Sequence, residues 1–523
     1  MKDKRLCSNV SYQGCDLNRY NNFDECILHC SKESTLSDYH GTFEMRSEFK
    51  YELINYIVKS IYKNKDNING IDEAIFKEYL EISEFNTNEN LKQLLKESIV
   101  VFNCISFPTI KNRDEENYED ILSLLGSIHF NYCNFYISGL DLQNVKCFFQ
   151  DCEFHDSWNI KNYDILPNQS NVIYQMCKFH EGISASGRNI EEERLQVTNS
   201  QFCNCDFGRE LVFEFTDIKS ALFINDKSYK GTYDLLKLQN CNIEGRFILN
   251  NYYIKTVVIE SSIFKDKFEF KKNKIDIFQI DNTNFKHIAD FYDTDFVQFS
   301  IKKSIFDNFT SFEECKFGDE KHLDDTELIS KFKYATFLNK INFRTTTFKN
   351  GLDIKHANFS EEPNFLNSEI ESLHTSRETF RSIKHSFDTT GNYLDANKYF
   401  SLEMKKYREE LKDKEGNKSE KLIFWLNEKI SNFGQNYIRP IIILIFSVFF
   451  YCFIIYITSI DFGDKIPSYI ISLNNLLNSF AKSIIHFKSL LTPGREFLSL
   501  AFSLWYSILI WQIIVSVKRH TRR

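Results

Sequence analysis

The sequence predicts a mainly β protein, a solenoid of short strands with a helical cap before it and a helical linker and two transmembrane helices after it. Three observations predict this fold class. A motif of a small residue, any residue and Phe recurs along the middle of the chain, and from Ser262 to Thr283 to Ser304 its step is 21 residues. Phe accounts for 51 of 523 residues, against 17 Gly and 6 Pro. Two charge-free apolar runs lie close to the C-terminus.

Composition excludes several classes of protein. The low Gly and Pro content excludes collagen-like and Pro-rich disordered chains, and 42% hydrophobic residues argue against wholesale disorder. A net charge of -8 argues against a basic nucleic-acid binder, so we expect no direct nucleic-acid binding. The first residues contain no apolar signal segment, so the 14 cysteines are expected to be reduced thiols.

Residues 1–35 form a region rich in Cys and His. Five soft ligand residues crowd this region: Cys7, Cys15, Cys26, His29 and Cys30. Zinc takes four N or S ligands in a tetrahedron and can hold a segment too short to fold alone. The sequence therefore predicts a small zinc knuckle, and unmetallated thiols are the alternative. The gap between Cys7 and Cys15 is longer than the usual ligand spacing, which weakens the zinc interpretation.

Residues 36–100 are predicted to be helical. Phe49, Leu53, Tyr56, Ile57 and Ile61 recur at helical spacing. A solenoid has to cover its first coil, so this helical region is expected to cap it.

Residues 101–368 are predicted to form the solenoid. A five-residue side with one large and one small inward residue suits such a coil, and four sides make a coil of about 20 residues. A β-sandwich would also alternate, but it does not explain the 21-residue step. The residues expected to stack in the core are Phe135, Phe154, Phe179, Phe207, Phe264, Phe285, Phe306, Phe317, Phe337, Phe348 and Phe359.

The cysteines of this region are interpreted as small core residues. Cys203-x-Cys205 is a metal or redox candidate without further ligands nearby in the sequence, so the core interpretation is preferred. Irregular insertions are expected near residues 155–175 and 208–240.

Residues 369–415 are predicted to form a helical hairpin. Thr375-x-x-Glu378 has the pattern of a capping box, and a helix with an apolar face follows it. Gly391 is expected to end this first helix, and Tyr393–Leu411 is the second arm.

Residues 416–436 are predicted to form an amphipathic helix. Leu422, Leu426, Ile430 and Phe433 line one face, and Trp425 lies beside them. A helix in the lipid headgroup layer has this pattern, and a solvated linker helix is the alternative.

Residues 437–523 are predicted to be a membrane domain. Its two runs, Ile441–Ile460 and Phe497–Val517, are 20 and 21 residues long, enough to cross a bilayer, and buried helices of a soluble protein are the alternative. By the positive-inside rule both ends lie in the cytoplasm. Between the runs, residues 468–491 carry a heptad-like apolar stripe, which predicts an extracytoplasmic helix on the outer leaflet or packed against copies of itself. The residues expected to anchor the domain are Trp425, Arg439, Lys518, Arg519, Arg522 and Arg523.

The chain resembles the membrane-anchored bacterial pentapeptide-repeat proteins. The resemblance is carried by the solenoid motif, by the aromatic-Gly pair Phe433-Gly434 before Arg439-Pro440, and by linker positions that match the family: Arg381, Lys384, Gly391, Tyr393, Ala396, Glu403 and Met404. It implies a right-handed quadrilateral β-helix in the cytoplasm, tethered to the bacterial inner membrane. It also implies Cys7, Cys15, Cys26 and His29 as zinc ligands, with Cys30 as a competing fourth ligand.

The function expected from these features is a non-enzymatic, membrane-tethered platform that binds a protein partner. The common phosphate-binding and hydrolytic motifs, G-x-x-x-x-G-K-[ST], H-E-x-x-H, G-x-S-x-G and G-x-G-x-x-G, are absent from the sequence. One alternative is an ion-channel-like or membrane-perturbing effector, in which a homo-oligomer forms the pore and the β-helix is the sensor. Another is a DNA-mimicking gyrase binder, as some pentapeptide-repeat proteins are.

Overall fold

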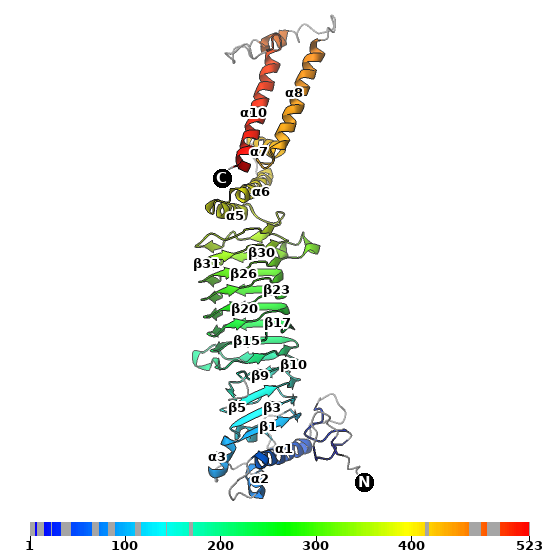
Figure 1. Ribbon diagram of the computed structural model, residues 1–523, viewed down its shortest axis with the longest axis vertical. Coiled ribbons are helices and arrows are strands. Elements are labelled where there is room, and N and C mark those ends of the chain that lie inside the picture. The colour runs from blue at the N-terminus through cyan, green and yellow to red at the C-terminus, as the bar shows by residue number, and fades with distance from the viewer. Residues whose placement is uncertain are drawn as a thin grey trace. The chain divides into compact units, whose positions relative to one another are not determined.

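The computed structural model describes residues 6–7, 15–21, 23–32, 43–64, 73–81, 89–109, 117–142, 144–166, 171–413, 418–459, 472–478 and 492–521. The chain divides into two compact units, residues 1–374 and residues 375–523. The first unit contains a parallel β-solenoid, and the second is helical (Figure 1).

Three helices precede the solenoid in the first unit: α1 (Phe43–Asn64), α2 (Glu73–Glu81) and α3 (Glu89–Glu97). The apolar stripe of α1 is buried, as its helical spacing predicts, and includes Leu53 and Ile57. The Tyr56 hydroxyl donates to the carbonyl of Val101 at 2.9 Å, and the Tyr56 ring stacks on Phe102. The helix α1 therefore packs on the first strand, β1, and covers the start of the array (Figure 1).

The predicted solenoid is confirmed, and all of its strand pairs are parallel. About 11 turns span residues 127–370, and β1 and β2 extend the pairing to residue 99. Two sheets contain strands from the N-terminal part of the array only. The first contains β1 (Ile99–Asn103), β3 (Ser127–Asn131), β5 (Lys146–Gln150), β8 (Asp164–Ile165), β9 (Tyr174–Gln175) and β13 (Phe202–Cys203). The second contains β2 (Ser106–Phe107), β4 (Asn134–Phe135), β6 (Glu153–Phe154), β10 (Lys178–Phe179) and β14 (Asp206–Phe207).

Three further sheets continue the array. The largest contains β7 (Trp158–Asn159), β11 (Ile183–Ser186), β15 (Glu210–Glu214), β17 (Gly231–Gln239), β20 (Tyr252–Glu260), β23 (Lys274–Asp281), β26 (Asp295–Lys302), β29 (Lys316–Phe317), β30 (Ser330–Lys333), β33 (Thr347–Phe348), β34 (Leu352–Asp353) and β36 (Glu369–Ile370). The next contains β12 (Leu195–Val197), β16 (Thr216–Ile218), β18 (Asn242–Ile243), β21 (Ile263–Phe264), β24 (Asn284–Phe285), β27 (Ile305–Phe306), β31 (Thr336–Phe337) and β35 (Asn358–Phe359). The last contains β19 (Phe247–Ile248), β22 (Phe268–Glu269), β25 (Ala289–Asp290), β28 (Thr310–Ser311) and β32 (Ile341–Asn342). Short helices α4 (Glu119–Ser123), η1 (Glu191–Glu193), η2 (Glu320–His322) and η3 (Thr326–Leu328) lie in the connections.

Each regular coil has four sides. The pairing of β20 with β23 is interrupted at Lys255 and Asp276, so each of these long strands supplies two sides. The two short strands that follow them, such as β21 and β22, supply the other two. Beyond β26 the two halves of the long strand separate, because β29 pairs with its start and β30 with its end.

The core is a set of aromatic stacks along the axis. Phe264 and Phe285 lie 4.9 Å apart between ring centroids, and Phe285 and Phe306 lie 4.6 Å apart, with almost parallel planes. Ten of the eleven predicted core Phe residues are at most 1% exposed. The eleventh, Phe359, is partly exposed on β35, at the end of its sheet.

The small residue of each motif, apart from Ala357, follows a corner residue with positive φ. Asn282, with φ 49°, precedes Thr283, whose hydroxyl donates to Asp281 O at 3.0 Å and to Ile259 O of the previous coil at 3.4 Å. Cys177 follows Met176 in the same way, and its thiol contacts Gln175 O and Phe149 O at 3.4 Å. Where the small residue is Cys, Ser or Thr, it is therefore a hydrogen-bond donor as well as a residue that fits the corner, whereas Ala335 and Ala357 only fit it.

The second unit begins with the predicted hairpin, made of α5 (Arg377–Thr389) and α6 (Tyr393–Asp413). Gly391 joins the two helices with φ +76°, a value that favours glycine. The capping box predicted at Thr375 is wrong by one residue. Ser376, in an extended conformation, is the N-cap, and its hydroxyl accepts from the Thr379 amide at 3.2 Å.

Three longer helices follow: α7 (Lys418–Ser431), α8 (Ile438–Ser459) and α10 (Glu496–Thr521). In the part of the chain that the structure describes, two helices are long and apolar enough to cross a membrane, Ile438–Ile457 and Glu496–Thr521. They lie side by side (Figure 1), and the Tyr506 hydroxyl on α10 donates to Ser447 O on α8 at 3.2 Å. Of the predicted extracytoplasmic helix at 468–491, residues 472–478 are helical and the remainder lies outside the described residues.

Candidate functional site

The Cys/His cluster near the N-terminus is built from two short loops. The Cys7 amide donates to Leu17 O at 3.0 Å, and an antiparallel bridge joins Leu6 and Asn18, so Cys7 is held beside the segment after Cys15. The second loop is a tight turn in which the amides of His29 and Cys30 both donate to Cys26 O. This turn brings His29 back over Cys26.

The structure brings together Cys7, Cys15, Cys26 and His29. The Cys15 and Cys26 sulfurs are 3.7 Å apart, and His29 Nδ1 is 3.5 Å from the Cys7 sulfur and 3.1 Å from the Cys26 sulfur. All four ligand atoms lie within 4.8 Å of one another. Around a tetrahedral zinc, two sulfurs are about 3.8 Å apart and a sulfur and a nitrogen about 3.6 Å apart, from ordinary Zn–S and Zn–N lengths. The cluster therefore fits a metal ion of this kind.

The environment of the cluster favours a thiolate at Cys15. The Cys26 amide donates to the Cys7 sulfur at 3.3 Å. A hydrogen bond from Cys26 is the main cause that lowers the pKa of Cys15, and the same interaction raises the pKa of Cys26. Cys26 and His29 are buried. Four protein ligands in a buried loop match the closed coordination of a structural zinc site.

Cys30, the competing ligand in the sequence, points to a different partner. Its sulfur lies 3.3 Å from the ammonium of Lys32, which also donates to Ile27 O at 2.8 Å and Cys30 O at 2.6 Å. Lys32 is 1% exposed, and this burial lowers its pKa. Cys30 and Lys32 thus hold the turn from inside, beside the four candidate ligands.

The Cys/His loop docks on the first coils of the solenoid. The Ser106 amide on β2 donates to Leu28 O at 2.8 Å, and the Ser106 hydroxyl donates to His29 O at 3.2 Å. The Ser31 and Tyr136 hydroxyls are 3.1 Å apart. A metal held in the loop would therefore stabilise the cap of the array.

The predicted anchoring residues of the second unit are placed as follows. Trp425 is 44% exposed on α7, and Arg439 and Lys518 are exposed. Arg519 is partly buried instead, because its guanidinium lies over the Phe400 ring at 4.3 Å and donates to Phe433 O. Arg522 and Arg523 lie outside the described residues.

No family of proteins, no curated protein and no solved structure matches this chain. Its function is therefore inferred from its own residues.

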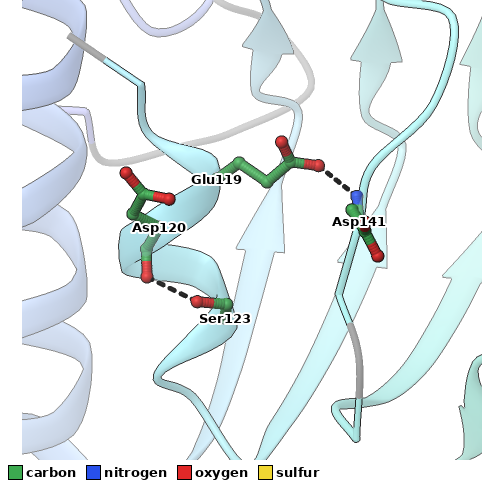
Figure 2. A pocket seen from close by; sticks show the side chains of 4 residues that line it. All are labelled: Glu119, Asp120, Ser123 and Asp141. Atoms are coloured by element: carbon green, nitrogen blue, oxygen red, sulfur yellow. Dashed lines mark hydrogen bonds between the residues drawn. The ribbon is translucent and has the colours of Figure 1, made fainter. Parts of the chain in front are cut away.

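An acidic hollow of about 440 Å³ lies beside α4, lined by Glu119, Asp120, Ser123 and Asp141 (Figure 2). Two hydrogen bonds join the residues drawn there. Glu119 accepts from the Asp141 amide, and the Ser123 hydroxyl donates to Asp120 O at 2.7 Å (Figure 2). Because a cluster of carboxylates on a surface is common without a ligand, this hollow is not a candidate site.

A second group of side chains that could hold a metal ion was not predicted from the sequence. Glu153, His155 and His180 converge on the outside of the solenoid. The available signal was the dipeptide Phe-His, which occurs in two successive repeats as Phe154-His155 and Phe179-His180. The irregular insertion between these repeats hid their register.

Proposed function

We propose that this protein is a membrane-anchored, non-enzymatic interaction platform, whose solenoid binds a protein partner in the bacterial cytoplasm. The observation that carries the proposal is a filled solenoid followed in the same chain by two apolar helices with exposed side chains. A zinc ion in the Cys/His loop would be structural.

The exposed faces of α8 and α10 support the anchor. Phe446 and Phe449 are 70% and 71% exposed on α8, and Trp511 is 64% exposed on α10. Soluble proteins rarely leave such large apolar patches in water, whereas a bilayer covers them. The exposed apolar residues Leu422, Ile423 and Trp425 on α7 favour a helix in the headgroup layer. The basic residues at the ends of α8 and α10 favour a cytoplasmic location for both termini.

The surface of the solenoid supports a protein partner. Phe side chains fill the axis of the array, so recognition falls to the outer faces. Charges on these faces are paired across coils, as in Lys271 with Asp290 at 2.9 Å and Lys286 with Asp307 at 2.8 Å. Interspersed charges of both signs favour a protein partner over phosphate binding, and also over DNA mimicry, which needs a continuous acidic face.

The four-sided coil supports a relationship to pentapeptide-repeat proteins. Each regular coil repeats after 21 residues and stacks one large inward residue per side on its equivalent in the next coil. We infer a divergent member of that group, in which Phe replaces much of the usual Leu.

Membrane extraction tests the anchor. Phe449 and Ile508 lie near the middle of α8 and α10, and both are exposed. The double variant Phe449→Lys, Ile508→Lys should move the protein from the carbonate-resistant membrane fraction to the soluble or aggregated fraction, because each lysine costs about 3 kcal/mol at the centre of a bilayer. The control Leu338→Lys changes an exposed residue of the solenoid and should stay in the membrane. Equal extraction of both variants would contradict the anchor.

Site-specific photo-crosslinking in intact cells tests the platform. Crosslinkers at Thr256 and Gln279, which face outward on β20 and β23, should give discrete protein adducts. The absence of adducts from positions on all four sides of the coil would contradict the proposal. Ion flux through liposomes that contain the full chain should equal that of empty liposomes, and reproducible flux would favour the channel-like alternative.

A further inference from the structure

Two imidazoles and one carboxylate meet on the outer surface of the solenoid. Glu153 and His155 flank the buried Phe154, so both point outward from their coil. Phe154 pairs with Phe179 between β6 and β10, which places His180 on the next coil opposite His155. These residues are separate from the Cys/His loop.

The three side chains are close enough to share one ion. His180 Nε2 lies 2.9 Å from Glu153 Oε2, and the rings of His155 and His180 stack with centroids 4.8 Å apart. One ligand atom from each residue can be chosen so that all lie within 4.8 Å of one another. Around a tetrahedral zinc, nitrogen and oxygen ligands are about 3.4 Å apart, so small side-chain rotations suffice. The His180 and Glu153 side chains are 33% and 46% exposed, which leaves room for water as a further ligand.

The surrounding structure holds the group in place. The Tyr136 ring stacks on His155 at 4.2 Å and is nearly parallel to it, and Asn134 Oδ1 is 3.2 Å from His155 Nε2. On the coil after His180 the equivalent residue is Gly208, so the column of side chains ends at the imidazole. A side chain could not be added there, because a Cβ at Gly208 would lie 2.5 Å from His180 O.

One lysine lies close to Glu153. Lys178 on β10 is the residue that pairs with Glu153 on β6. It is exposed, so its ammonium can turn toward solvent.

We infer that Glu153, His155 and His180 form a second metal site, which binds a divalent transition-metal ion of the Zn²⁺ class on the face of the solenoid. Imidazole nitrogens select zinc and its neighbours over Mg²⁺ and Ca²⁺, which prefer oxygen ligands. On binding, each histidine carries its proton on the nitrogen that does not face the ion. The hydrogen bond between His180 and Glu153 is lost, and both residues bind the same ion instead. The site is open, unlike the Cys/His cluster, so a solvent molecule completes its coordination.

Zinc titration of the detergent-solubilised full chain tests the site, with histidine-specific acylation and mass spectrometry as the readout. Zn²⁺ should protect His155 and His180 from acylation while His287, an exposed histidine on the same array, stays reactive. The variant His180→Ala should weaken Zn²⁺-dependent protection of His155 at least about tenfold. The matched variant His287→Ala should leave that protection unchanged.

Cobalt binding separates this site from the Cys/His cluster. Co²⁺ at the cysteines gives thiolate charge-transfer bands, which should persist in His180→Ala, whereas the bands of a nitrogen and oxygen site should be lost. A second variant, Glu153→Gln, keeps a hydrogen-bonding partner for His180 and should also weaken metal binding. Equal reactivity of His155 with and without Zn²⁺ in the folded wild-type chain would overturn the inference, as would unchanged protection in His180→Ala.

Discussion

At the scale of single residues, the corner position explains why Cys, Ser and Thr alternate along the array. Each follows a residue with positive φ and donates to a backbone carbonyl. The acceptor is usually two residues earlier, as in Cys152 to Gln150 O and Ser304 to Lys302 O, and for Cys315 it is Phe291 O of the previous coil. A thiol and a hydroxyl are interchangeable in this role, since both are small donors. The many cysteines are thus a structural choice, and burial raises the pKa of Cys241 to about 12, which keeps its thiol protonated.

Removal of one corner hydroxyl should destabilise the array. Ser304 is buried, its hydroxyl donates to Lys302 O at 2.8 Å, and it accepts from the Thr283 amide at 3.1 Å. The variant Ser304→Ala leaves this amide unsatisfied and should lower the free energy of unfolding by about 1–3 kcal/mol. Urea unfolding followed by circular dichroism measures the change. Ser304→Thr keeps the hydroxyl, as Thr283 does at the equivalent position of the previous coil. This variant should lower the free energy of unfolding by clearly less.

The stacked Phe residues give a second prediction at this scale. Phe285 lies between Phe264 and Phe306 and is 1% exposed. Phe285→Ala should lower the free energy of unfolding by about 3–5 kcal/mol, because a cavity opens in the middle of the stack. Phe285→Ile, which copies Ile243 of an earlier coil in the same row, should cost less. Equal unfolding midpoints for the alanine and isoleucine variants would contradict the stacking argument.

At the scale of elements, the Cys/His loop contains two groups of residues: the candidate metal ligands and the residues that hold the turn in place. Cys7, Cys15, Cys26 and His29 point to one centre, whereas Cys30 faces the buried Lys32 ammonium. The sequence left Cys30 as a competing fourth ligand. Only the turn geometry shows that its sulfur points to Lys32 and away from the other four residues.

Two cysteine variants check this division. Cys15→Ser should lose the zinc that copurifies with the protein and increase proteolysis in residues 6–32, since the loop then lacks its metal. Cys30→Ser should retain the zinc. Metal analysis of the purified chains and limited proteolysis measure the two effects, and equal zinc content in both variants would contradict the assignment of Cys15.

The helical hairpin of α5 and α6 was predicted from the sequence, but its N-cap was not. The predicted arms, the break at Gly391 and the buried face of Phe380 and Ile383 are confirmed, because burial follows helical periodicity. The cap was misplaced because Thr375 and Ser376 are both suitable N-cap residues. Their backbone conformation decides between them, and the sequence does not reveal it.

At the scale of the whole molecule, the solenoid behaves as a linear array. Each regular coil contacts the coils before and after it, and register is kept by 21-residue steps between equivalent corners. Stability in such arrays is close to a sum over neighbouring coils. Whole coils should therefore be removable.

Deletion of residues 262–282 tests this property. It removes one coil and joins Ser261, a corner residue with positive φ, to Thr283, which occupies the same position as Ser262. The shortened chain should remain folded, with β-sheet circular dichroism retained. Deletion of residues 262–279 is the matched control, because it shifts the register by three residues and turns inward side chains outward, so it should aggregate. Loss of the fold in both deletions would contradict a linear array.

The sequence by itself determined the periodic parts of this protein. The solenoid, its Phe rows, the helical hairpin and the two apolar helices all follow from burial that repeats at a fixed spacing, and the spacing is visible in one dimension. The tertiary structure decided what depends on register and direction. It brought Cys7, Cys15, Cys26 and His29 together, turned Cys30 toward Lys32 and Arg519 onto Phe400, and brought Glu153, His155 and His180 together. These contacts join residues that no fixed spacing in the sequence relates, and only the folded chain fixes which residues lie opposite each other.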